Sequence, residues 1–190
     1  MRKPIITSIV VFVGILALLF ALLQMGQGEE STQDAAESST NGELLGVDKR
    51  PTCPKVDLGT PLPCLGAGVE SAPSQAKYTV VNVWAWWCGP CREELPAVEA
   101  FAKEHPEYAV VGVHADPNAA NGAALLNDLN LDLPSYQDGE GQFAATYSLP
   151  NVVPITLVLD QNGQLIGQKA QVFHSASELN TAINAIVGGQ

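Results

Sequence analysis

The sequence has few basic residues: nine Lys and Arg stand against twenty Asp and Glu, which gives a formal net charge of −11. Nucleic-acid binding needs a basic surface that displaces counterions from phosphates, so this class of function is excluded. Cysteine is scarce as well, because four residues in a chain of 190 are too few for a small disulfide-dense scaffold. The sequence also lacks a second C-x-x-C and a histidine at zinc-finger spacing. Since a zinc site needs about four ligands, neither a metal nor another cofactor is predicted.

A long apolar run lies near the amino terminus. Arg2 and Lys3 precede the run from Ile5 to Leu23, whose helical length at ~1.5 Å per residue matches the hydrocarbon core of a bilayer. Acidic residues follow, so the positive-inside rule leaves the amino terminus in the cytoplasm. A cleaved signal peptide is the alternative, although no small-x-small site follows Leu23. We predict a single-pass transmembrane anchor at residues 1–25 of a cell-membrane protein, with the remainder extracytoplasmic, where disulfides persist.

The segment after this run has a different composition. Residues 26–50 contain mainly Gln, Ser, Thr, Gly and Glu, with almost no large apolar residue. Such a segment cannot bury enough surface to offset its ordering entropy, so a flexible acidic and polar linker is predicted. Residues 51–190 have a globular composition and are predicted to form one domain. Its first part, 51–74, is rich in proline and glycine, and it is predicted to hold a short strand or hairpin.

The rest of the domain alternates between patterns typical of strands and of helices. We predict an α/β fold with a mixed central sheet flanked by helices, in which Asn162-Gly163 closes an antiparallel hairpin between the last two strands. The helix from Cys88 should begin at the carboxyl end of a central strand, where ligands usually bind. The predicted strands cover 78–83, 109–113, 133–136, 155–159 and 165–171. Two longer helices are predicted at 88–103 and 175–187. Between them, one helix is predicted to start at 116 and a short one to carry Phe143 and Tyr147.

The helix in the middle of the domain has a recognisable start. Asp116 and Pro117 are predicted as its N-cap and first helical residue, because aspartate caps helices and proline is tolerated in the first turn. This helix is predicted to carry Ala120, Ala124 and Leu129.

Cys88 and Cys91 stand at the predicted junction between a strand and a helix. Unpaired backbone N–H groups and the positive end of the macrodipole stabilise a thiolate at a helix amino terminus. Because the thiolate is the nucleophile in disulfide exchange, we predict that Cys88 attacks and that Cys91, one turn further in, resolves the mixed disulfide. Pro90 fits the first turn, where its missing N–H costs nothing. A zinc knuckle or a structural disulfide is the alternative, and redox chemistry is favoured.

The residues around this pair, Trp-Ala-Trp-Trp-Cys-Gly-Pro-Cys-Arg-Glu-Glu-Leu-Pro at 84–96, resemble the thioredoxin superfamily. Within it they are most similar to the TlpA/ResA branch of membrane-anchored bacterial thiol–disulfide proteins. The resemblance covers residues 51–187 and implies a thioredoxin-like fold. Trp87, Gly89 and Pro90 adjoin the cysteines and are expected to form the substrate-contacting rim, whereas Trp84 is expected in the core.

The resemblance also assigns a role to Pro154. This residue falls where the superfamily holds a cis-proline beside the cysteines, an isomer that is a minority state for X-Pro bonds. The cis bond would turn the backbone of Val153 toward the site, where it can pair with an extended substrate chain. An ordinary trans-proline at a strand start is the alternative. Many relatives have threonine directly after this proline, whereas this sequence has Ile155, which weakens inference about substrate preference.

Glu94 matches an acidic residue that the TlpA/ResA branch carries three positions after its second cysteine. The match implies a carboxylate one turn beyond Cys91 that shuttles the proton of the resolving thiol. A solvated glutamate on the helix face is the alternative. Asn82 falls where thioredoxins proper carry a buried aspartate, and asparagine there is common in the TlpA/ResA branch. The relay of thioredoxin proper is therefore absent, which favours Glu94 as the acid–base group.

Cys53 and Cys64 bracket a proline-rich loop. In an extracytoplasmic domain, a structural disulfide between them is the simplest interpretation, and it would add roughly 3 kcal/mol at best. A second redox pair that exchanges electrons with Cys88 and Cys91 is one alternative. Two free thiols are the other, and these would be liable to oxidation.

The dipeptide Gly-Pro between Cys88 and Cys91 resembles that of reducing thioredoxins. We therefore predict an extracytoplasmic reductase of particular protein disulfides. The family resemblance implies apocytochrome c as a substrate and a membrane electron donor of the DsbD/CcdA type. A disulfide oxidase or isomerase for secreted proteins is the alternative. A non-catalytic binding module or a copper chaperone is disfavoured, because the cysteine pair and Pro154 are intact and the C-x-x-x-C spacing is missing.

Overall fold

The computed structural model describes Val47 and residues 50–189. These residues belong to the second of two compact units, Ser39–Gln190. The predicted anchor, and the predicted linker apart from Val47 and Arg50, lie outside the described residues. Within the described part, no helix has the length and apolar character needed to cross a membrane.

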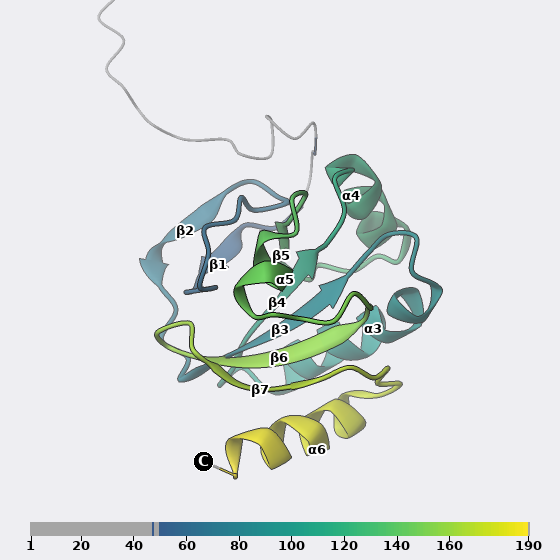
Figure 1. Ribbon diagram of the computed structural model, residues 1–190. Helices are drawn as coiled ribbons and strands as arrows, with labels where there is room; N and C mark the ends of the chain where they lie inside the picture. Colours follow the sequence, from purple (N-terminus) through teal and green to yellow (C-terminus); the bar gives the residue numbers. More distant parts are fainter. Residues whose placement is uncertain (1–46, 48–49, 190) are drawn as a thin grey trace, which may run out of the picture. The chain divides into compact units, whose positions relative to one another are not determined.

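A five-stranded mixed sheet forms the centre of the domain, with strand order β5-β4-β3-β6-β7. Strands β5, β4 and β3 run parallel to one another, whereas β6 is antiparallel to both β3 and β7 (Figure 1). This arrangement confirms the predicted α/β fold and the hairpin between the last two strands. The strands are β3 Tyr78–Trp84, β4 Ala109–His114, β5 Ser135–Gln137, β6 Ile155–Asp160 and β7 Leu165–Lys169.

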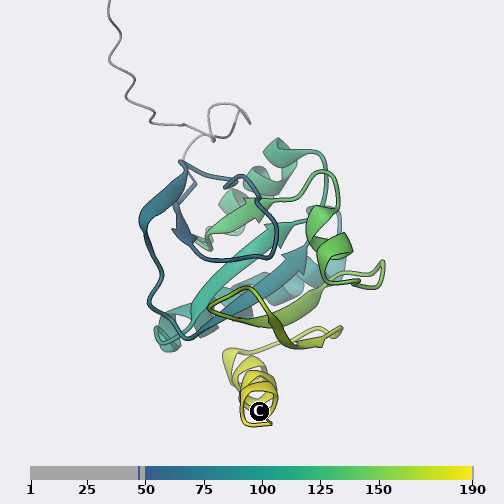
Figure 2. The same ribbon diagram turned by 60° about the vertical axis from the view of Figure 1, so that its left-hand side comes forward.

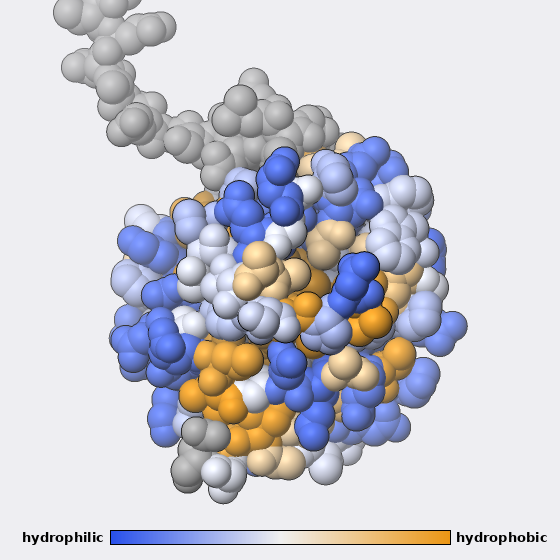
Figure 3. All heavy atoms as spheres, in the orientation of Figure 1, coloured by the Kyte–Doolittle hydropathy of each residue, from blue (hydrophilic) through white to orange (hydrophobic). Residues whose placement is uncertain are grey.

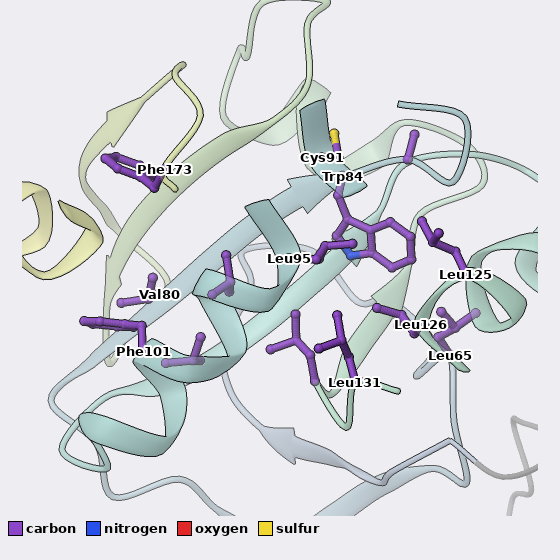
Figure 4. Close-up of a cluster of buried hydrophobic side chains, with 14 of the residues drawn as sticks. Leu65, Val80, Trp84, Cys91, Leu95, Phe101, Leu125, Leu126, Leu131 and Phe173 are labelled. Carbon is purple, nitrogen blue, oxygen red and sulfur yellow. The ribbon is translucent and has the colours of Figure 1, made fainter. Parts of the chain in front are cut away.

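Alternate residues of β3 point to opposite faces of the sheet, and both faces are buried. Val80 and Trp84 pack with apolar side chains of α3 (Gly89–Glu104), α4 (Ala119–Asp128) and α6 (Ala176–Val187), a cluster shown in Figure 4. On the other face, Val81 and Val83 pack with Phe143 of α5 (Gln142–Thr146) and with residues of the amino-terminal segment. We call these the helical cluster and the amino-terminal cluster.

The amino-terminal segment holds a small sheet of β1 (Cys53–Lys55) and β2 (Val69–Pro73). Both views place this sheet and α6 at opposite ends of the domain, with the central sheet between them (Figures 1 and 2). The segment thus holds short strands, as predicted, but the two strands pair in parallel, so the hairpin alternative is wrong. Parallel strands need a crossover. The intervening chain supplies it by passing along the central sheet, where Cys64 forms a bridge with Tyr136.

The start of α4 also differs from the prediction. Asn118 is the N-cap, with its side chain accepting from the backbone N–H of Asn121 at 3.1 Å, and the helix begins at Ala119. The Asp116 carboxylate instead accepts from the backbone N–H of Asn118, which forms a turn before the helix. Ala120 and Ala124 lie in α4, as predicted, and both are exposed, whereas Leu129 follows the helix as its C-cap.

Candidate active site

Cys88 and Cys91 form a disulfide at the amino terminus of α3. Cys88 is the N-cap, in extended conformation, and its backbone N–H donates to the carbonyl of Ala85 at 3.1 Å. The backbone N–H of Cys91 donates to the Cys88 sulfur at 3.1 Å, in the place of a capping side-chain oxygen. This bond and the helix dipole would stabilise negative charge on the Cys88 sulfur once the disulfide is reduced.

The two sulfurs differ in their access to solvent. Cys88 is 5% exposed, whereas Cys91 is fully buried. The intervening Gly89 and Pro90 are exposed on the surface above them. An incoming sulfur can therefore approach Cys88 more readily than Cys91, which agrees with the predicted order of nucleophile and resolving cysteine.

The loop before β6 brings Val153 to the cysteines. The Val153–Pro154 peptide bond is cis, and the carbonyl oxygen of Val153 lies 3.6 Å from the Cys88 sulfur. The next residue, Ile155, pairs with Val83 on the central strand, which fixes the loop against the sheet. The structure thus brings together the cysteines and the proline that the sequence placed at one site.

Glu94 is fully buried one turn after Cys91 and belongs to a polar group that we call the Glu94 cluster. Its Oε2 accepts from Nδ2 of Asn82 at 2.8 Å, and its Oε1 accepts from the backbone N–H of Phe173 at 3.0 Å. Thr156 on β6 completes the cluster, with its Oγ1 3.4 Å from Asn82 Nδ2. The alternative of a solvated helix-face glutamate is therefore wrong.

Burial raises the pKa of Glu94 above its ordinary value of 4.5. The hydrogen bonds from Asn82 and Phe173 and the nearby His174 favour the ionised form, but they offset only part of the desolvation. A buried carboxyl group with a raised pKa, one helical turn after Cys91, is better suited than an ordinary carboxyl group to accept and return the proton of that thiol.

Trp87 is the most exposed of the three tryptophans, at 59%, and its indole N–H donates to the Asp116 carboxylate at 2.9 Å. With Val153, Leu149 and Pro150 it lines a groove of about 430 Å³ beside the cysteines. Trp84 is fully buried in the helical cluster, as predicted. The face of the domain drawn in Figure 3 is largely polar, with patches of apolar side chains.

Sequence reasoning missed three members of the site: Asp116 as the partner of Trp87, Thr156, and the Phe173 backbone N–H. Asp116 carried a usable signal, because it follows β4 at the edge of the sheet where ligands usually bind. Its place before a proline favoured the helix-cap interpretation instead. The other two contacts join residues far apart in the chain and have no local sequence signal.

Cys53 and Cys64 also form a disulfide, and both are fully buried. They lie in the amino-terminal cluster, whereas Cys88 and Cys91 lie in the helical cluster on the other face of the sheet. No cysteine among the described residues is free. Their burial on the opposite face favours a structural role over exchange with the first pair.

Residues 63–168 match the family model described as the AhpC/TSA family. The chain belongs to this family. It is 26% identical to the sporulation thiol–disulfide oxidoreductase A of Bacillus subtilis, a match that covers 65% of this chain and 76% of the relative. It is 22% identical to the thiol–disulfide oxidoreductase ResA of Oceanobacillus iheyensis, over 86% of this chain and 79% of the relative. A 34% match to the thioredoxin-like protein YneN of Bacillus subtilis covers 47% of this chain and 54% of the relative, about half its length.

The solved structures give the fold. A secreted Mycobacterium tuberculosis disulfide oxidoreductase, described as homologous to E. coli DsbE, superimposes with a TM-score of 0.56 at 24% identity, over 67% of this chain and 96% of that one. A Chlorobium tepidum protein described as a putative thiol:disulfide interchange protein DsbE superimposes with a TM-score of 0.58 at 21% identity. This match covers 73% of this chain and 99% of that one. The fold is thus thioredoxin-like, and with these relatives the Cys88–Cys91 pair makes the chain a thiol–disulfide oxidoreductase.

Proposed function

We propose that the chain is a membrane-anchored, extracytoplasmic reductase of specific protein disulfides. The observation that carries this proposal is the Cys88–Cys91 pair at the start of α3, in which Cys88 is 5% exposed and Cys91, one turn before Glu94, is fully buried. The Gly-Pro dipeptide between them supports the reducing direction. The apolar run at residues 5–23 supports the anchor.

In the proposed reaction, the Cys88 thiolate attacks a substrate disulfide, forms a mixed disulfide and releases one substrate thiolate. Glu94 then accepts the proton of the Cys91 thiol. The resulting Cys91 thiolate attacks the Cys88 sulfur, forms the Cys88–Cys91 bond and releases the second substrate thiolate. The two substrate thiolates take up protons from solvent or from Glu94. The enzyme dithiol is oxidised by two electrons and the substrate disulfide is reduced by two.

Substrate binding follows from the groove beside the cysteines. An extended segment of the substrate would pair with the backbone of Val153, 3.6 Å from the Cys88 sulfur. Trp87 and the exposed Gly89 and Pro90 would contact the residues that flank the substrate cysteine. Because the groove is lined mainly by apolar side chains, we expect at least one apolar residue next to that cysteine.

The proposed substrate is apocytochrome c, whose haem-site cysteines must be reduced before haem attachment. The similarity to ResA and to the sporulation enzyme, both named thiol–disulfide oxidoreductases, supports dithiol exchange, and the Gly-Pro dipeptide supports its reducing direction. Since such a reductase must itself be reduced outside the cytoplasm, we propose a membrane electron donor of the DsbD/CcdA type.

The experiment that tests this proposal is a redox titration of the full chain against glutathione and dithiothreitol. We expect a midpoint close to that of thioredoxin, about −270 mV, and reduction of an oxidised apocytochrome c by the reduced chain. Cys88→Ser is the matched control and should abolish the reduction. A midpoint close to that of the oxidant DsbA, about −120 mV, would instead support the oxidase alternative.

A further inference from the structure

The Glu94 cluster leaves one polar atom without a partner. Asn82 is fully buried, and its Nδ2 donates both to Glu94 Oε2 and towards Thr156 Oγ1. Its Oδ1, by contrast, is one of three buried side-chain atoms among the described residues that have no hydrogen-bond partner. Buried polar atoms without partners are rare and costly, so this one calls for a physical explanation.

The two oxygens of Glu94 have partners of different kinds. Oε1 accepts from the backbone N–H of Phe173, a group that is always a donor. Oε2 faces the side-chain amide of Asn82, which carries a donor at one end and an acceptor at the other. A proton on Oε1 would meet a fixed donor. The proton of neutral Glu94 therefore belongs on Oε2.

Protonation of Oε2 changes what Asn82 must supply. With Glu94 ionised, Nδ2 serves both Oε2 and Thr156 Oγ1, as the structure has it. With Oε2 protonated, a carbonyl oxygen is needed in the same place. A half-turn of the amide places Oδ1 there, since the two ends have nearly the same size, and the Thr156 hydroxyl can rotate to donate to it. The amide makes two hydrogen bonds in either orientation and leaves its other end without a partner, so Oδ1 is the spare acceptor that neutral Glu94 uses.

We propose that Asn82 is a positioning residue whose side-chain amide reverses when Glu94 Oε2 takes up the proton of the Cys91 thiol. The proton leaves the Cys91 sulfur and bonds to Oε2, and no electron is transferred in this step. The idea rests on the proposed dithiol exchange but not on its direction. It would apply equally to a reductase and to an oxidase.

The charges around Glu94 allow this role for Asn82. Cys91 lies one turn before it on α3, and His174 follows Phe173 on the loop before α6. The backbone N–H of His174 is held by Glu178, which is exposed. From β3 and β6 the cluster receives only the uncharged Asn82 and Thr156. Asn82 is thus the side chain on the sheet that responds directly to the charge of Oε2.

The test is a pH titration of the oxidised full chain by nuclear magnetic resonance, with ¹³C at the glutamate carboxyls and ¹⁵N in the asparagine side chains. We expect the Asn82 amide resonances to shift with the same midpoint as the Glu94 carboxyl carbon. Titration of Glu94 with no accompanying change at the Asn82 amide would overturn the proposal. This measurement uses the native sequence and does not depend on the folding of any variant.

A variant adds a functional readout. Asn82→Ala removes a hydrogen bond from both the ionised and the neutral form of Glu94. Because a hydrogen bond to an ionised group is roughly twice as strong as one to a neutral group, the pKa of Glu94 should still rise, by about one unit, a tenfold change. The pH profile for resolution of a glutathione mixed disulfide at Cys88 should move to higher pH by the same amount. Asn184→Ala, at an exposed position of α6, is the matched control and should move neither.

A merely structural role for Asn82 would lower the melting temperature of Asn82→Ala and leave both the pKa of Glu94 and the pH profile unchanged. That result would overturn the proposal. Because the probe is glutathione, the outcome is independent of the natural substrate. An oxidant-like midpoint of the Cys88–Cys91 pair would contradict the proposed function alone.

Discussion

At the scale of single residues, Glu94 is a carboxyl group placed where an apolar side chain would normally stand. It is fully buried on α3 and accepts a hydrogen bond from the sheet residue Asn82. Ionisation there costs desolvation energy that its two hydrogen bonds offset only in part. The protein thus retains a residue that lowers its stability at neutral pH, which is expected when a group serves chemistry rather than folding.

This cost predicts a pH-dependent effect of Glu94→Gln. The folded protein holds the Glu94 proton to higher pH than the unfolded chain, so its free energy of unfolding falls as the pH rises from about 4.5 through the raised pKa. Glutamine removes that loss. We expect Glu94→Gln to be more stable than the wild type at pH 7 and no more stable at pH 4, as measured by urea denaturation. A constant difference across this range would contradict the assignment.

The same substitution should slow the redox reaction. Glutamine cannot accept the proton of the Cys91 thiol, so resolution of a mixed disulfide should slow by about 10²-fold, the lower range for loss of a general base. Stopped-flow measurement with a glutathione mixed disulfide at Cys88 would determine the rate. Glu93→Gln, at the exposed neighbouring position, is the control and should leave the rate unchanged.

At the scale of secondary-structure elements, α4 approaches the end of β4 closely at one residue. The close approach occurs at Gly122, where a Cβ atom would lie 2.7 Å from ring atoms of His114. His114 is itself fully buried, with its ring against Trp84 at 4.7 Å between centroids and its Nδ1 2.9 Å from Gln137 Oε1. Burial also lowers the pKa of His114, so the ring is neutral at pH 7. The glycine thus lets α4 cover the end of β4, where His114 pairs with Trp84, the last residue of β3 before the active-site turn.

Gly122→Ala should therefore destabilise the protein, although alanine is the better helix former by up to about 1 kcal/mol. The clash with His114 should reduce the free energy of unfolding by about 1–3 kcal/mol, the usual cost of overpacking. Ala124→Gly, exposed on the same helix, measures the propensity difference without a clash. A Gly122→Ala protein more stable than the wild type in urea would show that α4 is free to shift.

At the scale of the whole domain, the central sheet separates two apolar clusters, each with its own disulfide. The Cys88–Cys91 bond is reached from the surface at Cys88, whereas both sulfurs of Cys53–Cys64 are buried. The second bond joins the segment of β1 to the loop that passes β5. Its position favours a structural role, so we expect it to contribute to stability and not to the redox reaction.

The double variant Cys53→Ala/Cys64→Ala tests this division. We expect a loss of up to about 3 kcal/mol in the free energy of unfolding, because an eleven-residue separation is no longer closed in the unfolded chain. The midpoint of Cys88–Cys91 should stay unchanged in a glutathione titration. A shifted midpoint with unchanged stability would show that the two pairs exchange electrons.

The sequence alone was sufficient wherever a property depends on neighbouring residues. The spacing of Cys88 and Cys91, the β-branched run at 78–83 and the Asn162-Gly163 turn are local patterns, and the structure has the corresponding helix start, strand and hairpin. The start of α4 was predicted wrongly because two capping residues, Asp116 and Asn118, lie two positions apart. Only the folded chain determines which of the two residues caps the helix.

The tertiary structure decided what surrounds the cysteines. Sequence places Glu94 one turn after Cys91, but its burial depends on contacts with Asn82 and with Phe173, which lies 79 positions away. The pairing of Trp87 with Asp116 likewise joins the ends of two neighbouring strands. The reactive pair is thus determined by local sequence, because a disulfide across a helix start needs only four residues. The groups around Glu94 that control proton transfer come from α3, β3, β6 and the loop before α6, and these parts of the chain meet only in the folded domain.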